Sequence, residues 1–232
     1  MNNNNIKIII PSFNCTNKII SVVRNLRNSN INNDILIIDD NSSSKSKLIL
    51  NFVKNKFARV CVLNNYKNLG QGGSIKKAIK HLNNSDCLIC TVDDDGQHTT
   101  VDIKKIIQKS NLVYFNNSII LGSRDLKFNI TPINSYIGNK ISSFLFEFIT
   151  KKKIIDTQTG LRFYGKYIAN KFLKINSTGF DFHNIMNYFL IKNKIKFLEV
   201  KIKTIYFDNN KQSRFKGTKD SLKILKKIFN YY

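Results

Sequence analysis

The first half of the chain alternates short apolar runs with stretches in which apolar residues recur every three or four positions. The apolar runs cover 6–10, 34–38, 59–63 and 87–92, and the helical spacing covers 19–26, 48–57, 70–82 and 101–108. Continuous apolar strands are typical of a parallel sheet that is buried on both faces. Right-handed crossovers through the helices then predict a doubly wound α/β fold.

The second half has a looser pattern. It predicts short strands at 119–121 and 161–164, helices at 135–150 and 182–192, one strand or a strand pair at 196–205, and a basic amphipathic helix at 217–229. Such a closing helix either packs on the domain, which we favour, or lies on a membrane surface. Because no repeat or linker interrupts the pattern, we expect a single domain over residues 1–232.

Composition indicates a folded, basic protein. The 232 residues are 42% hydrophobic and include 17 Phe, which supports a buried core and argues against disorder. The formal net charge of +23 would suit a nucleic acid or an anionic membrane as partner. The lysines are spread along the whole length, however, so we favour a solvated basic surface and expect no specific nucleic-acid site. A weak attraction to anionic lipid still follows from the charge.

Cysteine usage and hydropathy predict a cytoplasmic protein. Four cysteines give no disulfide framework in a chain of this size. Cys87 and Cys90 share a predicted strand at an odd offset, which places their sulfurs on opposite faces and prevents a shared metal. The first residues lack a signal-peptide layout, and no apolar run approaches the ~20 residues of a membrane span. The charge leaves open peripheral contact with the inner face of a membrane.

Acidic residues gather at two places. Five of the 15 Asp and Glu lie in Asp39-Asp40 and Asp93-Asp94-Asp95, each directly after a predicted parallel strand. Ligands of open α/β sheets bind at this carboxyl edge, and clustered carboxylates repel one another unless a positive charge joins them. A solvated acidic turn explains either cluster alone, whereas two clusters on one edge of a lysine-rich chain favour a binding site.

The second cluster predicts a divalent metal site. If the strand continues, Asp93 and Asp95 face one side, and Gln97 can add an oxygen. A few oxygen ligands suit Mg²⁺ or Mn²⁺, which keep positions open for phosphate oxygens. His98 is an alternative ligand, although we favour a place beside a helix N-cap for it. No Cys or second His has the spacing that zinc would need.

Seven short motifs follow one another over residues 6–214. They are Ile10-Pro11-Ser12-Phe13-Asn14, Ile38-Asp39-Asp40-Asn41-Ser42-Ser43, Asn68-Leu69-Gly70-Gln71-Gly72-Gly73, Asp93-Asp94-Asp95-Gly96-Gln97-His98, Leu121-Gly122-Ser123-Arg124, Gly138-Asn139-Lys140 and Asp156-Thr157-Gln158-Thr159-Gly160-Leu161-Arg162. In this order they resemble family 2 glycosyltransferases, above all the dolichyl- or polyprenyl-phosphate mannosyltransferase-like branch. The resemblance implies a GT-A fold with a mixed, mostly parallel sheet. It also implies inverting, metal-dependent transfer of a hexose from a UDP- or GDP-sugar to a polyprenyl phosphate or a growing cell-surface glycan.

The same resemblance assigns roles to individual residues. It divides the chain into a donor-binding half, 1–122, and an acceptor-binding half, 123–232. Donor binding falls to the Pro11 backbone, Asp39, Asp40, Gly70, Gly72, Asp93 and Asp94, and metal binding on the diphosphate to Asp93, Asp95 and Gln97. The glycines line the nucleoside or sugar pocket in this assignment; as a helix start they could instead bring N–H groups to an anion. A divalent cation would stabilise the negative charge that develops on the departing diphosphate.

Three of the arginines are candidates for binding phosphate. Only six Arg stand against 32 Lys, and Arg124, Arg162 and Arg214 lie in loops with Gly, Ser or Thr. The planar guanidinium suits phosphate, so we expect these three to bind donor or acceptor phosphate, with a surface charge as the alternative.

An alcohol acceptor needs a base, whereas a lipid phosphate, with a second pKa of ~6, is already largely ionised. Asp181 is the first candidate base and His183 the second, and a histidine satisfied by the backbone is an equal alternative.

Two other functions fit part of the pattern. A nucleotidyltransferase also uses paired acids and a metal, but it would carry a Gly-rich basic loop after the first strand, where this chain has Pro11-Ser12-Phe13-Asn14. A non-catalytic basic protein that kept the fold would bind membranes or other polyanions in general. The acidic clusters argue against it, because they would repel such a ligand.

Overall fold

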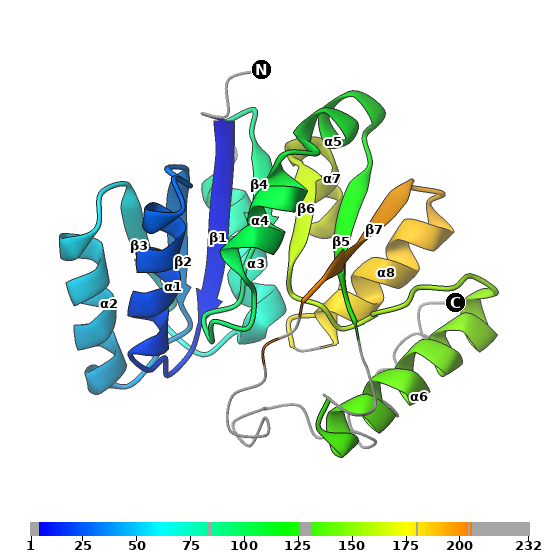
Figure 1. Ribbon diagram of the computed structural model, residues 1–232, viewed down its shortest axis with the longest axis horizontal. Helices are drawn as coiled ribbons and strands as arrows, with labels where there is room; N and C mark the ends of the chain where they lie inside the picture. Colours follow the sequence, from blue (N-terminus) through cyan, green and yellow to red (C-terminus); the bar gives the residue numbers. More distant parts are fainter. Residues whose placement is uncertain (1–4, 83–84, 126–130, 180, 204, 206–232) are drawn as a thin grey trace.

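The computed structural model describes residues 5–82, 85–125, 131–179, 181–203 and 205. Its strands are β1 (Ile6–Ser12), β2 (Asp34–Asp39), β3 (Val60–Asn64), β4 (Leu88–Thr91), β5 (Ile119–Arg124), β6 (Arg162–Gly165) and β7 (Phe197–Ile202). Its helices are α1 (Lys18–Asn28), α2 (Ser44–Lys56), α3 (Gly70–His81), α4 (Thr100–Ile107), α5 (Ser110–Asn116), α6 (Ile133–Thr150), α7 (Lys166–Phe172) and α8 (Phe182–Lys192). Figure 1 shows a central sheet with helices packed on both faces.

Within the described residues the strands form one sheet in the order β3-β2-β1-β4-β6-β5-β7. β1 is parallel to β2 and β4, β2 to β3, and β5 to β7, while β6 is antiparallel to both β4 and β5. The predicted mixed, mostly parallel sheet is therefore confirmed. Because β6 alone runs in the opposite direction, its first residue, Arg162, lies at the edge where the other strands end.

The sheet separates two hydrophobic clusters, which explains the continuous apolar strands. One cluster joins alternate strand residues to apolar side chains of α1, α2, α4 and α5; the other joins the remaining strand residues to α3, α7, α8 and Phe146 of α6. Figure 1 shows α4 in front of the sheet and α3 behind it. Cys90 belongs to the first cluster and Cys87 to the second, and both are free thiols. The prediction that these two sulfurs lie on opposite faces is confirmed.

The periodicity misses two short helices, α5 and α7. Each has seven residues, too few to show a helical repeat of apolar positions. Helix α2 also begins four residues before the predicted start, at Ser44, and β7 is one strand rather than a pair. The predicted basic helix at 217–229 lies outside the described residues. In the part of the chain that the structure describes, no helix is long and apolar enough to cross a bilayer.

Candidate functional site

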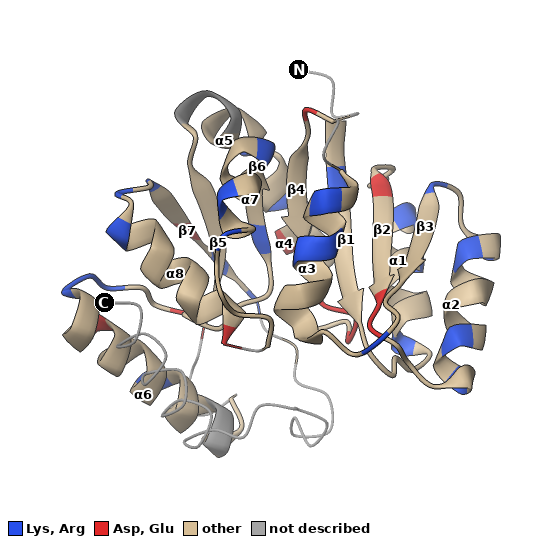
Figure 2. Ribbon diagram, turned by 180° about the vertical axis from the view of Figure 1, so that it is seen from behind, with Lys and Arg blue, Asp and Glu red and all other residues tan. Residues whose placement is uncertain are grey.

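Four strand ends and one strand start meet at the carboxyl edge of the sheet. β1 ends at Ser12, β2 at Asp39, β4 at Thr91 and β5 at Arg124, while β6 begins at Arg162. Figure 2 shows several acidic positions gathered at this edge, whereas basic positions are distributed over the outer helices. The edge therefore brings together most of the residues that the sequence singles out.

Asp40 fixes the start of α3. One oxygen of its buried carboxylate accepts hydrogen bonds from Asn65 Nδ2 (2.6 Å) and the Leu69 backbone N–H (2.7 Å). The other oxygen accepts from the Gly70 N–H at 2.8 Å. These bonds satisfy N–H groups that a helix start leaves without intrahelical partners. Nucleoside binding by Asp40 stays a prediction, because this carboxylate already has three donors within the chain.

Asp39, unlike Asp40, has a carboxylate oxygen without a donor among the described residues. Its side chain is fully buried, and Oδ1 accepts from the Ser42 N–H at 3.1 Å. Oδ2 has no hydrogen-bond partner among the described residues. A buried acceptor without a donor costs free energy, so such an atom in a native fold calls for an explanation. Pro11 pairs with Ile38 directly beside it, as a shared nucleoside pocket requires.

Asp93 is held by three separate parts of the chain. Oδ1 accepts from Gln71 Nε2 in the first turn of α3 (3.2 Å), and Oδ2 lies 3.0 Å from His98 Nε2. Gly160 passes so close that an added Cβ would lie 2.3 Å from Asp93 Oδ1. His98 immediately precedes Thr99, the N-cap of α4, so its predicted place beside a cap is confirmed.

The other two acids of this motif lie in a turn. β4 ends at Thr91, and the chain turns through Gly96, whose φ is 80°. Asp94 accepts from Ser12 Oγ at 2.7 Å, and Asp95 Oδ1 accepts from the Gln97 N–H at 2.9 Å. The condition under which Asp93 and Asp95 would face one side, a strand that continues through them, is therefore not met, because β4 ends before the acidic motif.

Proximity within the turn shifts the pKa values of its groups. Burial alone would raise the pKa of Asp93, but the hydrogen bond and charge of His98 hold it below its usual range. Burial and the charge of Asp93 both raise the pKa of Asp95. Burial would lower the pKa of His98, and its bond to Asp93 outweighs that effect and raises it. A cation bound between these two carboxylates would relieve their repulsion, so the pair is suited to binding one.

The donor set fits Mg²⁺ or Mn²⁺ better than a metal with a closed protein cage. In the described ranges no three His, Cys, Asp or Glu side chains are arranged to hold a metal ion together. Mg²⁺ commonly uses one or two carboxylates and completes its shell with water and substrate phosphates. Asp93 and Asp95 match that pattern, and the ligand set Asp93, Asp95 and Gln97 stays a prediction.

Arg124 is engaged by a buried carboxylate. Its Nε and Nη2 donate to the two oxygens of Asp156 at 2.5 and 2.9 Å, and Nη2 also donates to Asn139 Oδ1 at 3.1 Å. Burial would raise the pKa of Asp156, but the Arg124 guanidinium beside it holds the pKa below its usual range. This bidentate pair excludes the alternative of a free surface charge. Phosphate binding by Arg124 stays a prediction.

Arg162 is fully buried and contacts neutral acceptors. Nε donates to the Thr159 carbonyl at 3.0 Å, Nη1 to Asn187 Oδ1 at 2.7 Å, and Nη2 to the Thr157 carbonyl at 3.4 Å. Burial lowers its pKa to about 10, so the guanidinium is still charged at neutral pH. Arg162 therefore fixes the loop that places Gly160 against Asp93. The alternative that Arg162 is a surface charge is excluded, because its side chain is fully buried.

The chain matches a known family over most of its length. Residues 7–173 match glycosyl transferase family 2. The chain belongs to this family. A UDP-N-acetylglucosamine–dolichyl-phosphate N-acetylglucosaminyltransferase from Methanococcus voltae is 31% identical, covering 87% of this chain and 86% of the relative. An uncharacterized protein from Methanocaldococcus jannaschii is 29% identical over 98% and 92% of the two chains.

Solved structures show the same fold. Glucosyl-3-phosphoglycerate synthase from Mycobacterium tuberculosis in complex with UDP has a TM-score of 0.69 at 10% identity, covering 98% of this chain and 79% of that one. The same synthase with Mn²⁺, UDP and glucosyl-3-phosphoglycerate also has a TM-score of 0.69, at 9% identity over 97% and 77%. The GT-A fold is thus confirmed. The chain is a glycosyltransferase, which decides against the nucleotidyltransferase and the non-catalytic alternatives.

In this glycosyltransferase the Gly-rich turn serves close packing. Gly70 has a φ of 77°, and an added Cβ would lie 2.5 Å from the Thr178 carbonyl oxygen. An added Cβ on Gly72 would lie 2.5 Å from Phe182 Cγ. The Gly70 N–H donates to the Asp40 carboxylate and the Gly73 N–H to the Thr178 carbonyl, so these two donors already have partners within the chain. Donor binding by Gly70 and Gly72 stays a prediction.

The two candidate bases lie at the start of α8. Asp181 is its N-cap residue, and its Oδ2 accepts from Ser177 Oγ at 2.6 Å. His183 is buried, and neither ring nitrogen has a hydrogen-bond partner among the described residues. Burial, and after it the charge of Arg162, lower the pKa of His183 to about 3. A histidine with this pKa accepts a proton poorly at neutral pH, and the alternative of a histidine satisfied by the backbone is wrong.

His183→Phe is expected to make the enzyme more resistant to acid. The folded-state pKa is depressed from 6.5 to about 3, so the unfolded state binds the proton first as the pH falls. The wild type therefore loses stability below about pH 6.5, on the order of 1–2 kcal/mol between pH 6.5 and 5 from this group alone. Urea unfolding at both pH values measures the effect, which the variant should lack. An equal acid sensitivity of the two proteins would contradict this assignment.

Some site residues are missed by the sequence prediction. Gln71, Asp156 and Gly160 lie within the recognised motifs, but a motif does not tell which side chain reaches another element. Asn187 of α8 has no motif signal and is found only through its bond to Arg162. Arg214, the third predicted phosphate ligand, lies outside the described residues.

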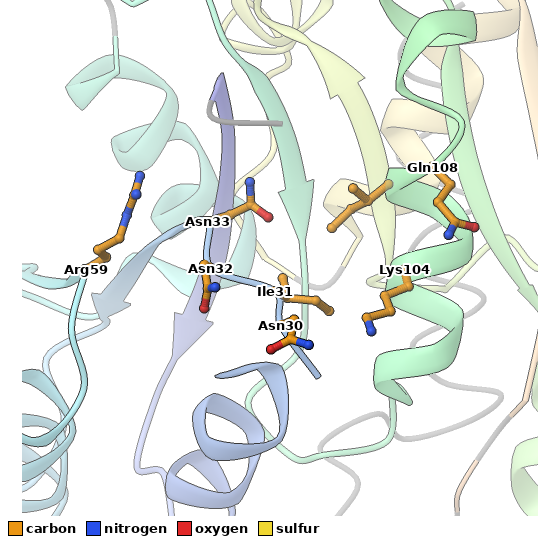
Figure 3. A pocket seen from close by; sticks show the side chains of 8 residues that line it. Asn30, Ile31, Asn32, Asn33, Arg59, Lys104 and Gln108 are labelled. Carbon is orange, nitrogen blue, oxygen red and sulfur yellow. The ribbon is translucent and has the colours of Figure 1, made fainter. Parts of the chain in front are cut away.

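A separate cavity of about 290 Å³ lies at the opposite edge of the sheet. Its lining residues are Asn30, Ile31, Asn32, Asn33, Arg59, Lys104, Ile107 and Gln108 (Figure 3). Residues 30–33 precede β2 and Arg59 precedes β3, so the cavity is at the amino ends of these strands. It contains no carboxylate and takes no part in the acidic site.

Proposed function

We propose that this glycosyltransferase moves a sugar from a UDP-sugar to a polyprenyl phosphate with inversion, assisted by Mg²⁺ or Mn²⁺. The observation that carries the proposal is the convergence of Asp39, Asp93 and Asp95 at one sheet edge, with one buried oxygen left without a donor. The Methanococcus voltae relative is named for transfer from a UDP-sugar to dolichyl phosphate, which supports the same substrate classes.

Asp39 favours uracil over guanine. Its Oδ2 is the open acceptor, while Oδ1 already accepts from the Ser42 N–H. Uracil presents a single ring N–H, which matches one open oxygen. Guanine presents a ring N–H beside an amino group, and this fork is best matched by two free carboxylate oxygens. The proposed donor is therefore a UDP-sugar, with the Pro11 backbone beside the base.

Asp93 and Asp95, with Gln97 as a third oxygen ligand, would hold the metal on the diphosphate. A bound divalent cation supplies Lewis-acid stabilisation of the charge on the leaving diphosphate. Gln71 and His98 fix the Asp93 carboxylate, while the Ser12 hydroxyl fixes Asp94. These contacts hold the acids in place before substrate arrives, which reduces reorganisation during the reaction.

The residues at the start of α8 favour an acceptor that is already ionised and needs no base. His183 is an unsuitable base at neutral pH because its pKa is about 3. A phosphate monoester needs no base, since it is largely ionised already. In the proposed step an acceptor phosphate oxygen attacks the anomeric carbon from the face opposite the diphosphate. The new C–O bond forms as the bond to UDP breaks, and UDP leaves with the electron pair.

The arginines would act on phosphate in two different ways. Asp156 fixes the plane of the Arg124 guanidinium, whose side chain is 16% exposed, so we assign Arg124 to the phosphate of the acceptor. Arg162 is enclosed, so we assign it a positioning role through the Thr157 and Thr159 carbonyls. Asp181 would orient the start of α8 at the acceptor end and would not remove a proton.

Titration calorimetry tests the donor assignment. We expect UDP to bind in the presence of Mn²⁺ and much more weakly in EDTA, and to bind more tightly than GDP. Asp39→Asn turns the open acceptor into an amide whose NH₂ can face the uracil N–H, and it should weaken UDP binding about tenfold or more. Asp86→Asn, an exposed acid at the other edge, is the matched control. Equal binding of UDP and GDP, or no effect of Asp39→Asn, would argue against a uracil at Asp39.

A further inference from the structure

We call the cavity at the amino ends of β2 and β3 the amino-edge cavity. Its volume of about 290 Å³ is at the lower end of the range for pockets that hold small molecules. Four amide side chains, two isoleucines and the cations Arg59 and Lys104 line it (Figure 3). Because no acid stands among these lining residues to balance the two cations, the cavity favours an anionic ligand.

Arg27 of α1 holds the two loops that form one side of the amino-edge cavity. Its Nη1 donates to the carbonyls of Ile31 (2.7 Å) and Asn33 (3.1 Å), which lie in the loop before β2. Its Nη2 donates to the carbonyl of Ala58 (2.8 Å), in the loop before β3. One guanidinium thus fixes both loops, so this side of the cavity is formed before a ligand binds.

Two residues of these loops have a left-handed backbone. The φ angles are 56° at Asn30 and 60° at Arg59. Asparagine adopts this conformation readily, whereas residues with longer side chains do so rarely. Such conformations cost free energy and gather at ligand sites. The backbone of Arg59 is therefore a second feature, besides its charge, that points to a ligand at this position.

Positive charge around the cavity exceeds negative charge. Arg59 donates to Asp34 Oδ1 through Nε (2.6 Å), so its two terminal nitrogens can donate to a ligand. Lys7 pairs with the same Asp34, which leaves one carboxylate shared between two cations. The half-buried Lys104 makes no hydrogen bond or ion pair with another described residue. Burial, and after it the charge of Arg59, lower the pKa of Arg27, so an anion bound here would relieve repulsion between cations.

We propose that the amino-edge cavity binds a small phosphorylated molecule, whose phosphate contacts Arg59 and Lys104 and whose hydroxyl groups contact the amides. A phosphate monoester carries about 1.5 to 2 negative charges at neutral pH, which matches two cations better than the single charge of a carboxylate. The guanidinium fork suits phosphate oxygens. Amide side chains both donate and accept hydrogen bonds, as the recognition of hydroxyl groups requires.

The amino-edge cavity is separate from the acidic site. The acidic site lies where β1, β2 and β4 end, and the cavity lies where β2 and β3 begin. A phosphate in the cavity is therefore not part of the donor diphosphate. The inference does not rest on the proposed donor or acceptor, so either can fail without the other.

Titration calorimetry of the full chain tests the inference with three probes, glucose 6-phosphate, inorganic phosphate and glucose. The titrations are made in EDTA, which removes any divalent cation that could hold phosphate at Asp93 and Asp95. We expect glucose 6-phosphate to bind most tightly, inorganic phosphate more weakly, and glucose not detectably. Lys104→Gln should weaken the binding of both phosphates about tenfold, the usual effect of losing one charged hydrogen-bond partner.

Two further variants control for charge and for folding. Lys105→Gln removes the same charge from the next position of α4, where Nζ donates to the Lys201 carbonyl (2.9 Å) and does not line the cavity. It should bind phosphate like the wild type. Arg59→Asn removes the guanidinium and keeps a residue that tolerates positive φ. It should weaken phosphate binding as Lys104→Gln does and change the unfolding temperature little, because the broken pair with Asp34 is exposed.

Two results would overturn the inference. The first is a wild type that binds glucose 6-phosphate no more tightly than glucose. The second is equal phosphate affinity in Lys104→Gln and Lys105→Gln, which would place the phosphate elsewhere on the basic surface. Equal affinities of the wild type for glucose 6-phosphate and inorganic phosphate would contradict the contacts assigned to the amides. Absence of metal-dependent UDP binding in the wild type would contradict the proposed function alone.

Discussion

Asp95→Asn is expected to lower the rate of sugar transfer about 10²- to 10³-fold, the usual effect of losing one group that stabilises charge in the transition state. The substitution removes charge and little else. Asparagine keeps the oxygen that accepts the Gln97 N–H bond, so the turn should stay intact. The loss would fall on kcat and on metal-dependent UDP binding, because Asp95 is the proposed partner of Asp93 on the cation.

The same variant should be more stable than the wild type in EDTA. Burial and Asp93 raise the pKa of Asp95, so its ionised form is less favourable in the folded than in the unfolded chain. At neutral pH this difference lowers the free energy of unfolding, and removing the charge restores it. Kinetic assays and thermal unfolding of Asp95→Asn and of the Asp86→Asn control measure both effects. An active Asp95→Asn variant would contradict its role in metal binding.

Gly160→Ala is the second substitution with a large expected effect. An added Cβ would lie 2.3 and 2.4 Å from the two oxygens of Asp93, so the carboxylate has to move. A displacement near 1 Å of a group that positions substrate costs about 100-fold in rate. Because the clash is with the end of one side chain, we expect the activity to fall much more than the thermal stability.

Gly165→Ala provides the matched control, at the end of β6, the strand that follows Gly160. Its added Cβ would meet only Leu88 Cδ2 at 3.7 Å, an ordinary van der Waals distance. We expect this variant to keep nearly the full rate of transfer, measured with the same substrates. If Gly160→Ala transferred sugar as fast as Gly165→Ala, the close approach of Gly160 to Asp93 would have no part in catalysis.

The first half of the fold follows from the sequence more directly than the second half. β1, β2 and β4 are continuous apolar runs, and α1 and α3 show clear helical spacing, so local patterns suffice there. The reversed direction of β6 is not predictable in this way. The four residues of β6 have no feature that would predict an antiparallel rather than a parallel neighbour.

The site residues likewise divide into those that local patterns predict and those that only the tertiary fold brings together. Asp39 and Asp93 are predicted because the first ends β2 and the second closely follows the end of β4, and strand ends meet at one sheet edge. The partners of Arg124 and Arg162 cannot be predicted in this way. Asp156 is 32 residues from Arg124 and Asn187 is 25 residues from Arg162, so only the tertiary fold brings each pair together. The alternation argument for Asp95 does not apply, because β4 ends at Thr91, before the acidic motif begins.

Transfer of label from a radioactive UDP-sugar to a short, water-soluble polyprenyl phosphate tests the proposed donor and acceptor together. UDP-N-acetylglucosamine, UDP-glucose and GDP-mannose would each be offered with Mn²⁺, to the phosphate and to the matching unphosphorylated polyprenol. We expect a lipid-linked product from a UDP-sugar and the phosphate, with none from the alcohol and none in the Asp95→Asn variant. Transfer to the alcohol, or transfer from GDP-mannose alone, would contradict it.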